Sequence, residues 1–459
     1  MKKSMLRIAA LVGVSALVVV VPASAATKKK AVAKKPAVKA AAKPATTTAA
    51  PVTTAAPVTT AAPVVAAGPA KPSGSTIKVG LLSAETGNAS SAYKNAPAVG
   101  LAWAKWVNET QGGVGGHPVE VITADDKNTA ADAIAGAKDL IENKGIVAIV
   151  LQDSTAETGI ASYINEKKFP VIGGSANNGS LVAGNAHGMS PYYFTTAPAG
   201  LAAQESPVVI ANFLGQKPYT AAVCAEVAAC AAGAATAANK ARATGLEYAG
   251  VLTVLGSSPN YTAECLEVMS RIAGSSRTSG FVSIGLAPTA MARLINDCVR
   301  QGYQGFFGAS SNTASEAIFD TIPVDNLKIA GYVNGFPWWS TAAPVKNFKD
   351  QMAKYAPKAE FRDPAATTTW SALELFRKTM SKASANVTKD EVLAAYYKIK
   401  DENLDGLLPK SLTFTEGKAA PLPNCYWPYK YEKKTFATLS LDAKTTGNGE
   451  TGDLRTFCG

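Results

Sequence analysis

Few residues of this 459-residue chain have the type and spacing that catalysis needs. The sequence has no G-x-S-x-G nucleophile motif, no H-E-x-x-H zinc motif and no P-loop. Asp125 and Asp126 are adjacent, so in a strand their carboxylates would face opposite sides, which disfavours a catalytic acid pair. The glycine-rich run from Gly113 to Pro118 precedes a predicted strand instead of opening a helix, which indicates a turn and not a phosphate-binding loop. We therefore expect no enzyme and no cofactor; a hydrolase that uses scattered acids is the enzymatic alternative.

The first 25 residues have the three parts of a secretory signal peptide. Three basic residues are followed by an apolar run over residues 8–21 and by Ala-Ser-Ala at residues 23–25. A membrane-spanning helix is the alternative, but the run is shorter than the roughly 20 residues that cross the hydrocarbon layer. No cysteine follows the cleavage site, so a lipid anchor is not predicted. We expect an exported protein at the cell surface, in the cell wall or in the periplasm.

The six cysteines point to disulfides, because an even set in an exported chain is typical of an oxidising compartment. A metal site is disfavoured, since no C-x-x-C spacing occurs and the only histidines are His117 and His187. Six cysteines allow fifteen pairings. We hypothesise bonds between cysteines that are near in sequence or on neighbouring predicted helices, with buried free thiols as the alternative: Cys224 with Cys230, Cys265 with Cys298, and Cys425 with Cys458.

Residues 26–75 are predicted to be a disordered spacer of Ala, Pro, Thr and Lys, with Thr-Thr-Ala-Ala-Pro-Val repeated three times between Thr47 and Val64. Its lysines either hold it to an anionic cell envelope or only keep it solvated. Of the 45 Lys and Arg residues, eleven lie within residues 1–75, which contain no acid, so the other 34 match the 34 Asp and Glu. The balanced remainder argues against nucleic acid as a partner.

From Thr76 onward, short β-type runs alternate with helical ones, which is typical of parallel sheets with crossover helices. Two series of strands are predicted: Ile77 to Leu82, Val119 to Thr123, Ile146 to Leu151 and Phe169 to Gly173, then Tyr219 to Val223, Gly250 to Leu255, Phe281 to Gly285 and Gly305 to Ala309. We predict the α/β class with two Rossmann-like lobes joined by a multi-crossover hinge. The expected boundaries are 76–198 for lobe 1, 199–328 for lobe 2, 329–418 for a return to lobe 1, and 419–459 for a C-terminal segment on lobe 2.

The sequence from Ile77 to Ile134 resembles the opening of the leucine/isoleucine/valine-binding proteins, which are type I periplasmic binding proteins. The most similar pieces are N-E-x-Q-G-G-V-x-G-H-P-V at Asn108 to Val119, the adjacent aspartates, and FPVIGGSANN at Phe169 to Asn178. Their order and spacing carry the resemblance, which runs from about Thr76 to Pro337. It implies a monomeric protein whose two lobes close around a small molecule and deliver it to the permease of an ABC transporter.

The resemblance also implies which residues hold the ligand. Helix starts suit this role because their N–H groups lack partners inside the helix. The first-lobe positions that match are Ser154 and Thr155 after one strand, Ser175, Ala176 and Asn177 after the next, and Tyr93 in the first loop. Each has an ordinary alternative: a helix cap for Ser154 or Thr155, a turn for Asn177, and loop packing for Tyr93.

The second lobe departs from the amino-acid-binding relatives. They carry an acid after the strand that matches Gly305 to Ala309, which pairs with the ligand's ammonium group, whereas this chain has Ser310-Ser311-Asn312. A buried ammonium without a carboxylate is costly, so we hypothesise that the ligand is an organic acid, an amide or an aromatic compound. Glu226 could restore the missing charge and keep an amino acid as the alternative. Phe336 either lines the cleft or packs the hinge.

Two other functions stay open at this point. A sensor would use the same cleft but present its closed form to a signalling receptor. A structural wall protein on a long stalk would bind no small molecule in the cleft.

Overall fold

The computed structural model describes residues 71–175, 190–198, 201–226, 228–274, 279–441, 447–450 and 452–458. These residues all belong to one compact unit, Ala66–Gly459. The predicted signal peptide, most of the predicted spacer, Ala176 and Asn177 lie outside the described residues. Within the described ranges, no helix combines the length and apolar character needed to cross a membrane.

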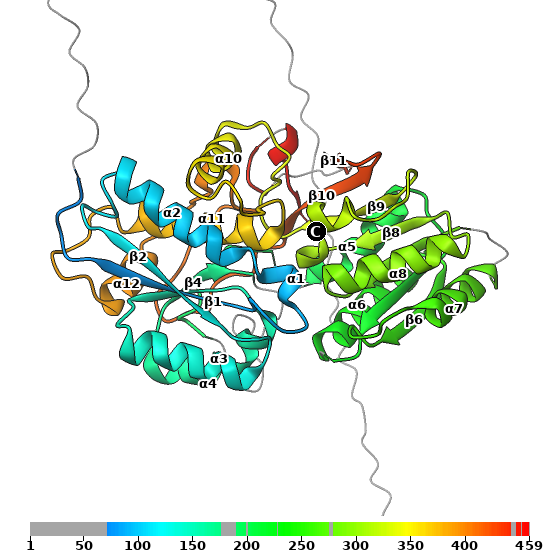
Figure 1. Cartoon of the computed structure of the whole chain (residues 1–459), viewed down its shortest axis with the longest axis horizontal. Helices are drawn as coiled ribbons and strands as arrows, with labels where there is room; N and C mark the ends of the chain where they lie inside the picture. The colour runs from blue at the N-terminus through cyan, green and yellow to red at the C-terminus, as the bar shows by residue number, and fades with distance from the viewer. Residues whose placement is uncertain are drawn as a thin grey trace, which may run out of the picture. The chain divides into compact units, whose positions relative to one another are not determined.

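Lobe 1 is built on a four-stranded parallel sheet with the order β2-β1-β3-β4. The strands are β1 (Ile77–Ser83), β2 (Val119–Asp125), β3 (Ala148–Leu151) and β4 (Val171–Gly174). Helices α2 (Ala96–Thr110) and α11 (Pro364–Thr379) cover one face, and α3 (Ala130–Lys138) and α4 (Ser154–Lys167) cover the other (Figure 1). Because both faces are covered, every residue of β3 and β4 is buried.

Lobe 2 contains the larger sheet, with the order β11-β10-β9-β8-β7-β5-β6 and β12 paired to β10. Its strands are β5 (Tyr219–Cys224), β6 (Tyr248–Val254), β7 (Phe281–Gly285), β8 (Phe306–Ala309), β9 (Lys328–Val333), β10 (Cys425–Glu432), β11 (Thr435–Thr438) and β12 (Phe457–Cys458). Strands β5 to β9 pair in parallel, whereas β10 pairs antiparallel with β9, β11 and β12. The antiparallel strands β10, β11 and β12 were not predicted from the sequence.

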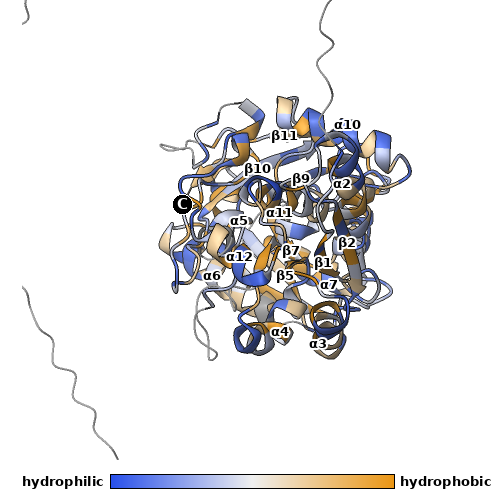
Figure 2. Cartoon of the chain, turned by 90° about the vertical axis from the view of Figure 1, so that its left-hand side faces the viewer, coloured by the Kyte–Doolittle hydropathy of each residue, from blue (hydrophilic) through white to orange (hydrophobic). Residues whose placement is uncertain are grey.

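Helices cover both faces of the second sheet as well. They are α5 (Leu201–Phe213), α6 (Ala228–Ala243), α7 (Thr262–Ala273), α8 (Pro288–Arg300) and the short α9 (Glu316–Phe319). Ala221 and Val223 of β5 belong to the apolar cluster under α5 and α6, whereas the intervening Ala222 packs into the cluster of α7 and α8. Figure 2 shows the resulting pattern, with hydrophobic colour on interior strands such as β1, β5 and β7 and hydrophilic colour toward the outside.

The chain passes between the lobes more than once. Strand β9 begins at the boundary expected at residue 328 and pairs with β8, so the chain leaves the second sheet only after Val333. Helices α10 (Ala343–Tyr355) and α11 then pack against α2 of lobe 1, and α12 (Lys389–Tyr396) follows. Strand β10 returns to pair with β9. These crossings supply the hinge that the sequence pattern predicted.

Aromatic side chains fill the connection between the lobes. Phe336 is fully buried, with its ring 5.2 Å from that of Phe348 in α10. Trp338 is also buried and donates from Nε1 to Glu316 Oε2 at 2.6 Å. Trp370 of α11 stacks on Trp106 of α2 at 5.1 Å. The structure therefore assigns Phe336 to the packing of the hinge.

The structure contains the three disulfides that the sequence analysis favoured, Cys224–Cys230, Cys265–Cys298 and Cys425–Cys458. The first joins the end of β5 to α6, and the second joins α7 to α8. Cys265 and Cys298 are fully buried and 33 residues apart, whereas Cys224 and Cys230 are six residues apart. A longer closed loop restricts the unfolded chain more, so the second bond should contribute more stability.

We predict that replacing both Cys265 and Cys298 with Ala lowers the free energy of unfolding by about 4 kcal/mol, and that the matched change at Cys224 and Cys230 lowers it by about 2 kcal/mol. Denaturant unfolding followed by circular dichroism measures both variants. Equal losses, or a larger loss from the six-residue loop, would contradict the assignment of stability to loop length.

Candidate functional site

Four buried polar side chains connect the carboxyl ends of the two sheets. Asn312 lies in the turn after β8, and its Nδ2 donates to Tyr93 OH at 3.1 Å and to Ser175 Oγ at 2.5 Å. Asn334, just after β9, donates from Nδ2 to the same Ser175 Oγ at 2.9 Å. We call Tyr93, Ser175, Asn312 and Asn334 the amide cluster. None of these four residues is more than 5% exposed to solvent. Ligands of open α/β sheets bind outside the carboxyl ends of the strands, which is where this cluster lies.

The amide cluster has acceptor capacity left over. The Oδ1 atoms of Asn312 and Asn334 are buried, and no described protein group hydrogen-bonds to either of them. The hydroxyl oxygen of Ser310 is also buried without a described hydrogen-bonding partner. A buried polar atom left without a partner costs about 1–3 kcal/mol, which a donor supplied by a bound molecule would recover. The cluster therefore suits a molecule that offers N–H or O–H groups to two neighbouring carbonyl oxygens.

The cluster itself is built from amides and hydroxyls and contains no charged side chain. Glu226, which the sequence analysis offered as a replacement acid, is exposed, and its Oε1 accepts from Gly256 N at 2.7 Å. Gly256 follows β6, the edge strand of the sheet, whereas Asn312 follows β8. Among the described residues, no hydrogen bond joins Glu226 to the amide cluster, and its role as a replacement acid stays a prediction. Asp363 is buried too, but it accepts from Asn95 and from Ala366 N and so caps α11.

The other predicted residues of lobe 1 form a separate network at the start of α4. Asp153 caps this helix by accepting from Thr155 N at 3.0 Å. Asn128 Nδ2 donates to Thr155 Oγ1 at 2.9 Å and to both carboxylate oxygens of Asp153. Ser154 is the first residue of α4. The hydroxyl of Thr155 therefore accepts from Asn128 while Asp153 caps the helix, and the amide cluster contains Tyr93 and Ser175 of the predicted residues.

Asn312 and Asn334 were not predicted as site residues. Both follow directly after strands of the second sheet, which is the signal that could have identified them. Asn312 lies in the short turn η2 (Ser311–Thr313), and Ser311 there has a φ of 59°, an uncommon value for a residue with a Cβ. The backbone thus turns sharply after β8 and brings the amide to lobe 1.

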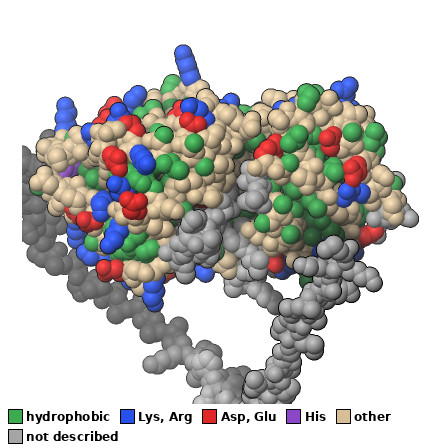
Figure 3. Space-filling view, turned by 90° about the horizontal axis from the view of Figure 1, so that it is seen from below, with side chains coloured by type: hydrophobic (Ala, Val, Ile, Leu, Met, Phe, Trp, Pro, Cys, Tyr) green, Lys and Arg blue, Asp and Glu red, His purple; other side chains and the backbone are tan. Residues whose placement is uncertain are grey.

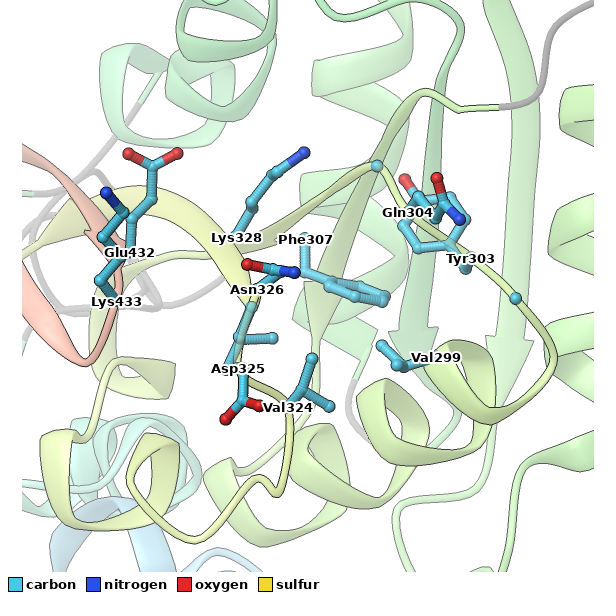
Figure 4. A pocket seen from close by; sticks show the side chains of 13 residues that line it. Val299, Tyr303, Gln304, Phe307, Val324, Asp325, Asn326, Lys328, Glu432 and Lys433 are labelled. Carbon is cyan, nitrogen blue, oxygen red and sulfur yellow. The ribbon is translucent and has the colours of Figure 1, made fainter.

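A large cavity lies elsewhere in lobe 2. Its volume is about 740 Å³, and it lies at the amino ends of β8 and β9. Figure 4 shows Phe307, Val324 and Val299 close together in it, with Lys328 and Glu432 at another side. Asn312 follows the opposite end of β8, so this cavity and the amide cluster cannot hold the same small molecule.

The surface carries both signs of charge. On the face shown in Figure 3, Lys and Arg side chains are interspersed with Asp and Glu. This mixture matches the equal numbers of acidic and basic residues in 76–459, and the described part of this face shows no continuous basic patch of the kind typical of nucleic-acid-binding proteins.

Asp126 is a buried acid close to Asp153 in the network at the start of α4. Burial, followed by the neighbouring charge of Asp153, raises the pKa of Asp126 to about 8. The acid in an unfolded chain has a pKa near 4, so the folded state keeps a proton that the unfolded state loses between these values. The stability that comes from this protonated acid is complete below pH 4 and is lost as the pH rises through about 8.

We predict that Asp126→Asn reduces this pH dependence. The free energy of unfolding of the unmodified protein should fall relative to that of the variant by up to about 1.4 kcal/mol per pH unit between pH 5 and pH 8. The control is Asp125→Asn: partial burial works against ionisation there, but hydrogen bonds from Thr86, Lys127 and Glu85 lower the pKa of Asp125. Its effect should therefore not vary with pH in this range. Parallel curves for the unmodified protein and Asp126→Asn in urea titrations would contradict the argument.

Known proteins are similar to this chain over both lobes. The sequence profile of the periplasmic binding protein family matches residues 76–435. No curated protein matches the chain in sequence. Similar solved structures include a fatty acid ABC transporter substrate-binding protein from Thermomonospora curvata, with 17% identity, a TM-score of 0.65 and coverage of 83% of this chain and 95% of that one. A leucine-binding protein from Thermotoga maritima has 14% identity and a TM-score of 0.63, with coverage of 79% and 98%. The chain belongs to the periplasmic binding protein family.

Proposed function

We propose that this protein is an extracytoplasmic solute-binding protein that captures a small molecule between its lobes and delivers it to the permease of an ABC transporter. The amide cluster is the observation that carries the proposal. It joins Tyr93 and Ser175 of lobe 1 to Asn312 and Asn334 of lobe 2, at the strand ends where such sheets bind ligands. Membership of the periplasmic binding protein family supports the same function. We further propose that the protein acts as a monomer and that its lysine-rich spacer associates with the cell envelope.

Opening and closing of the lobes would couple ligand capture to delivery. Besides the amide cluster, Ser91 Oγ of lobe 1 lies 3.3 Å from Thr289 Oγ1 and 3.4 Å from Thr289 N in lobe 2. The contacts between Ser91 and Thr289 are long, so they break at small cost when the lobes separate. A molecule that bonds to both lobes shifts the equilibrium toward the closed form by its differential affinity for that form. A permease can then distinguish the loaded protein from the empty one.

The chemistry of the cluster favours a neutral ligand. The amino-acid-binding relatives use an acid after the strand that corresponds to β8, whereas this chain has Ser310 and Asn312 there. An ammonium group in this position would lose its hydration without gaining a carboxylate. The free carbonyl oxygens of Asn312 and Asn334 also disfavour a carboxylate, which brings no donors. Among the ligand classes inferred from the sequence, an amide fits these groups best.

The proposal predicts that a small molecule is released when natively purified protein is denatured, and that this molecule raises the melting temperature when it is added back. Asn312→Leu should weaken its binding by about tenfold to a hundredfold, because the bonds to Tyr93 and Ser175 of lobe 1 and the free acceptor offered to the ligand are lost together. Asn386→Leu is the matched control, since Asn386 is exposed in the loop before α12. Mass spectrometry identifies the molecule and calorimetry measures both variants. Failure of every small molecule in a wide panel to bind would contradict the proposed function.

A further inference from the structure

A second cavity in lobe 2 adjoins the amide cluster. It has a volume of about 200 Å³ and lies between α5, α6 and the face of the sheet formed by β5, β7 and β9. We call it the α6 cavity. Its fifteen described lining residues include no charged side chain, and most are apolar or small. It therefore differs from the cavity at the amino ends of β8 and β9, which is lined partly by Asp325, Lys328 and Glu432.

The α6 cavity exists because this part of α6 carries very small side chains. Gly233, Ala234 and Ala237 face β5, where Ala221 and Val223 are the opposing residues. A larger residue at these helix positions would fill the space, as in ordinary packing of helices on sheets. A Cβ added at Gly233 meets no atom within 4 Å, so the backbone does not demand a glycine there. The space is therefore open to a ligand of matching size.

Two short segments link the α6 cavity to the amide cluster. Ser310 and Ser311 line the cavity and Asn312 comes next, while Tyr332 lines it and Asn334 is two residues further along. The hydroxyl of Ser310 is buried without a hydrogen-bonding partner among the described residues. The cavity therefore reaches the two segments that lead to Asn312 and Asn334.

We propose that the α6 cavity binds the apolar part of the ligand whose neutral polar group contacts Asn312 and Asn334. The inference rests on the proposed function and narrows the substrate class to neutral amides with an aliphatic or aromatic tail. The cavity volume of about 200 Å³ sets the size of this tail. An apolar cavity of about 150 Å³ accommodates benzene, so a phenyl group or a chain of about four to six carbons fits. Charged relatives of the same length should bind weakly, because the amide cluster, where their charged group would lie, contains no charged side chain.

The test measures the binding of acetamide, butanamide, hexanamide and benzamide by calorimetry, with hexanoate and hexylammonium as charged relatives. Affinity should rise about fourfold for each methylene group from acetamide to hexanamide, because each buries apolar surface. Both charged compounds should bind at least about tenfold more weakly than hexanamide. Affinity that does not depend on chain length, or hexanoate or hexylammonium binding as tightly as hexanamide, would overturn the inference.

Two variants with the same chemical change on α6 locate the tail. Ala234 lines the cavity and is 8% exposed, whereas Ala235 is exposed. Ala234→Leu should weaken hexanamide binding at least about tenfold and leave acetamide binding unchanged, whereas Ala235→Leu should alter neither. Gly233→Leu fills the same space and replaces Ala234→Leu in the test if that variant does not fold. Equal behaviour of the cavity variant and Ala235→Leu overturns the inference.

Failure of the inference can be distinguished from failure of the proposed function. Suppose that no amide binds, but another molecule released from the native protein binds and loses affinity in Asn312→Leu. The proposed solute binding is then supported, and the proposed binding of an apolar tail in the α6 cavity is wrong. If nothing binds, both fall.

Discussion

Two asparagine amides buried between the lobes constrain the rest of the structure. An amide removed from water needs hydrogen bonds, and the two Nδ2 groups of Asn312 and Asn334 both use the hydroxyl of Ser175. This arrangement requires β4, β8 and β9 to end at the same place, although they belong to two sheets. Because the carbonyl oxygens of both amides stay without a described partner, the protein groups alone do not complete the network. In the proposed function, a bound solute that donates to these oxygens completes the network.

Neighbouring residues hold the ends of β8 and β9 in place. Tyr429 of β10 donates to Ala309 O at 2.7 Å and so fixes the last residue of β8. Gly331 of β9 lies so close to this carbonyl that a Cβ there would be 1.7 Å from the oxygen. Only glycine lets β9 run this near to the end of β8 and bring Asn334 to the cluster. The antiparallel C-terminal strand is therefore part of the support for the site.

The sequence predicted the first lobe and most strands of the second because alternating apolar runs and crossover helices are local patterns. Ser175 and Tyr93 were predicted from a family resemblance and belong to the cluster, whereas Thr155 accepts from Asn128 at the start of α4 and Phe336 packs the hinge. Asn312 entered the sequence analysis only because the amino-acid-binding relatives carry an acid in this segment and this chain does not. Its partners lie 137 and 219 residues away, and no local pattern shows which strand ends will meet across two lobes.

The central claim is that a ligand closes the lobes around the amide cluster, and a distance measurement between the lobes tests it most directly. Fluorophores on cysteines that replace Lys105 on α2 and Ala263 on α7, both exposed, report the separation by energy transfer. Protein stripped of its bound molecule by unfolding and refolding should sample a longer distance, and the released molecule should restore the shorter one. A single distance that does not change when the molecule is added would contradict the account.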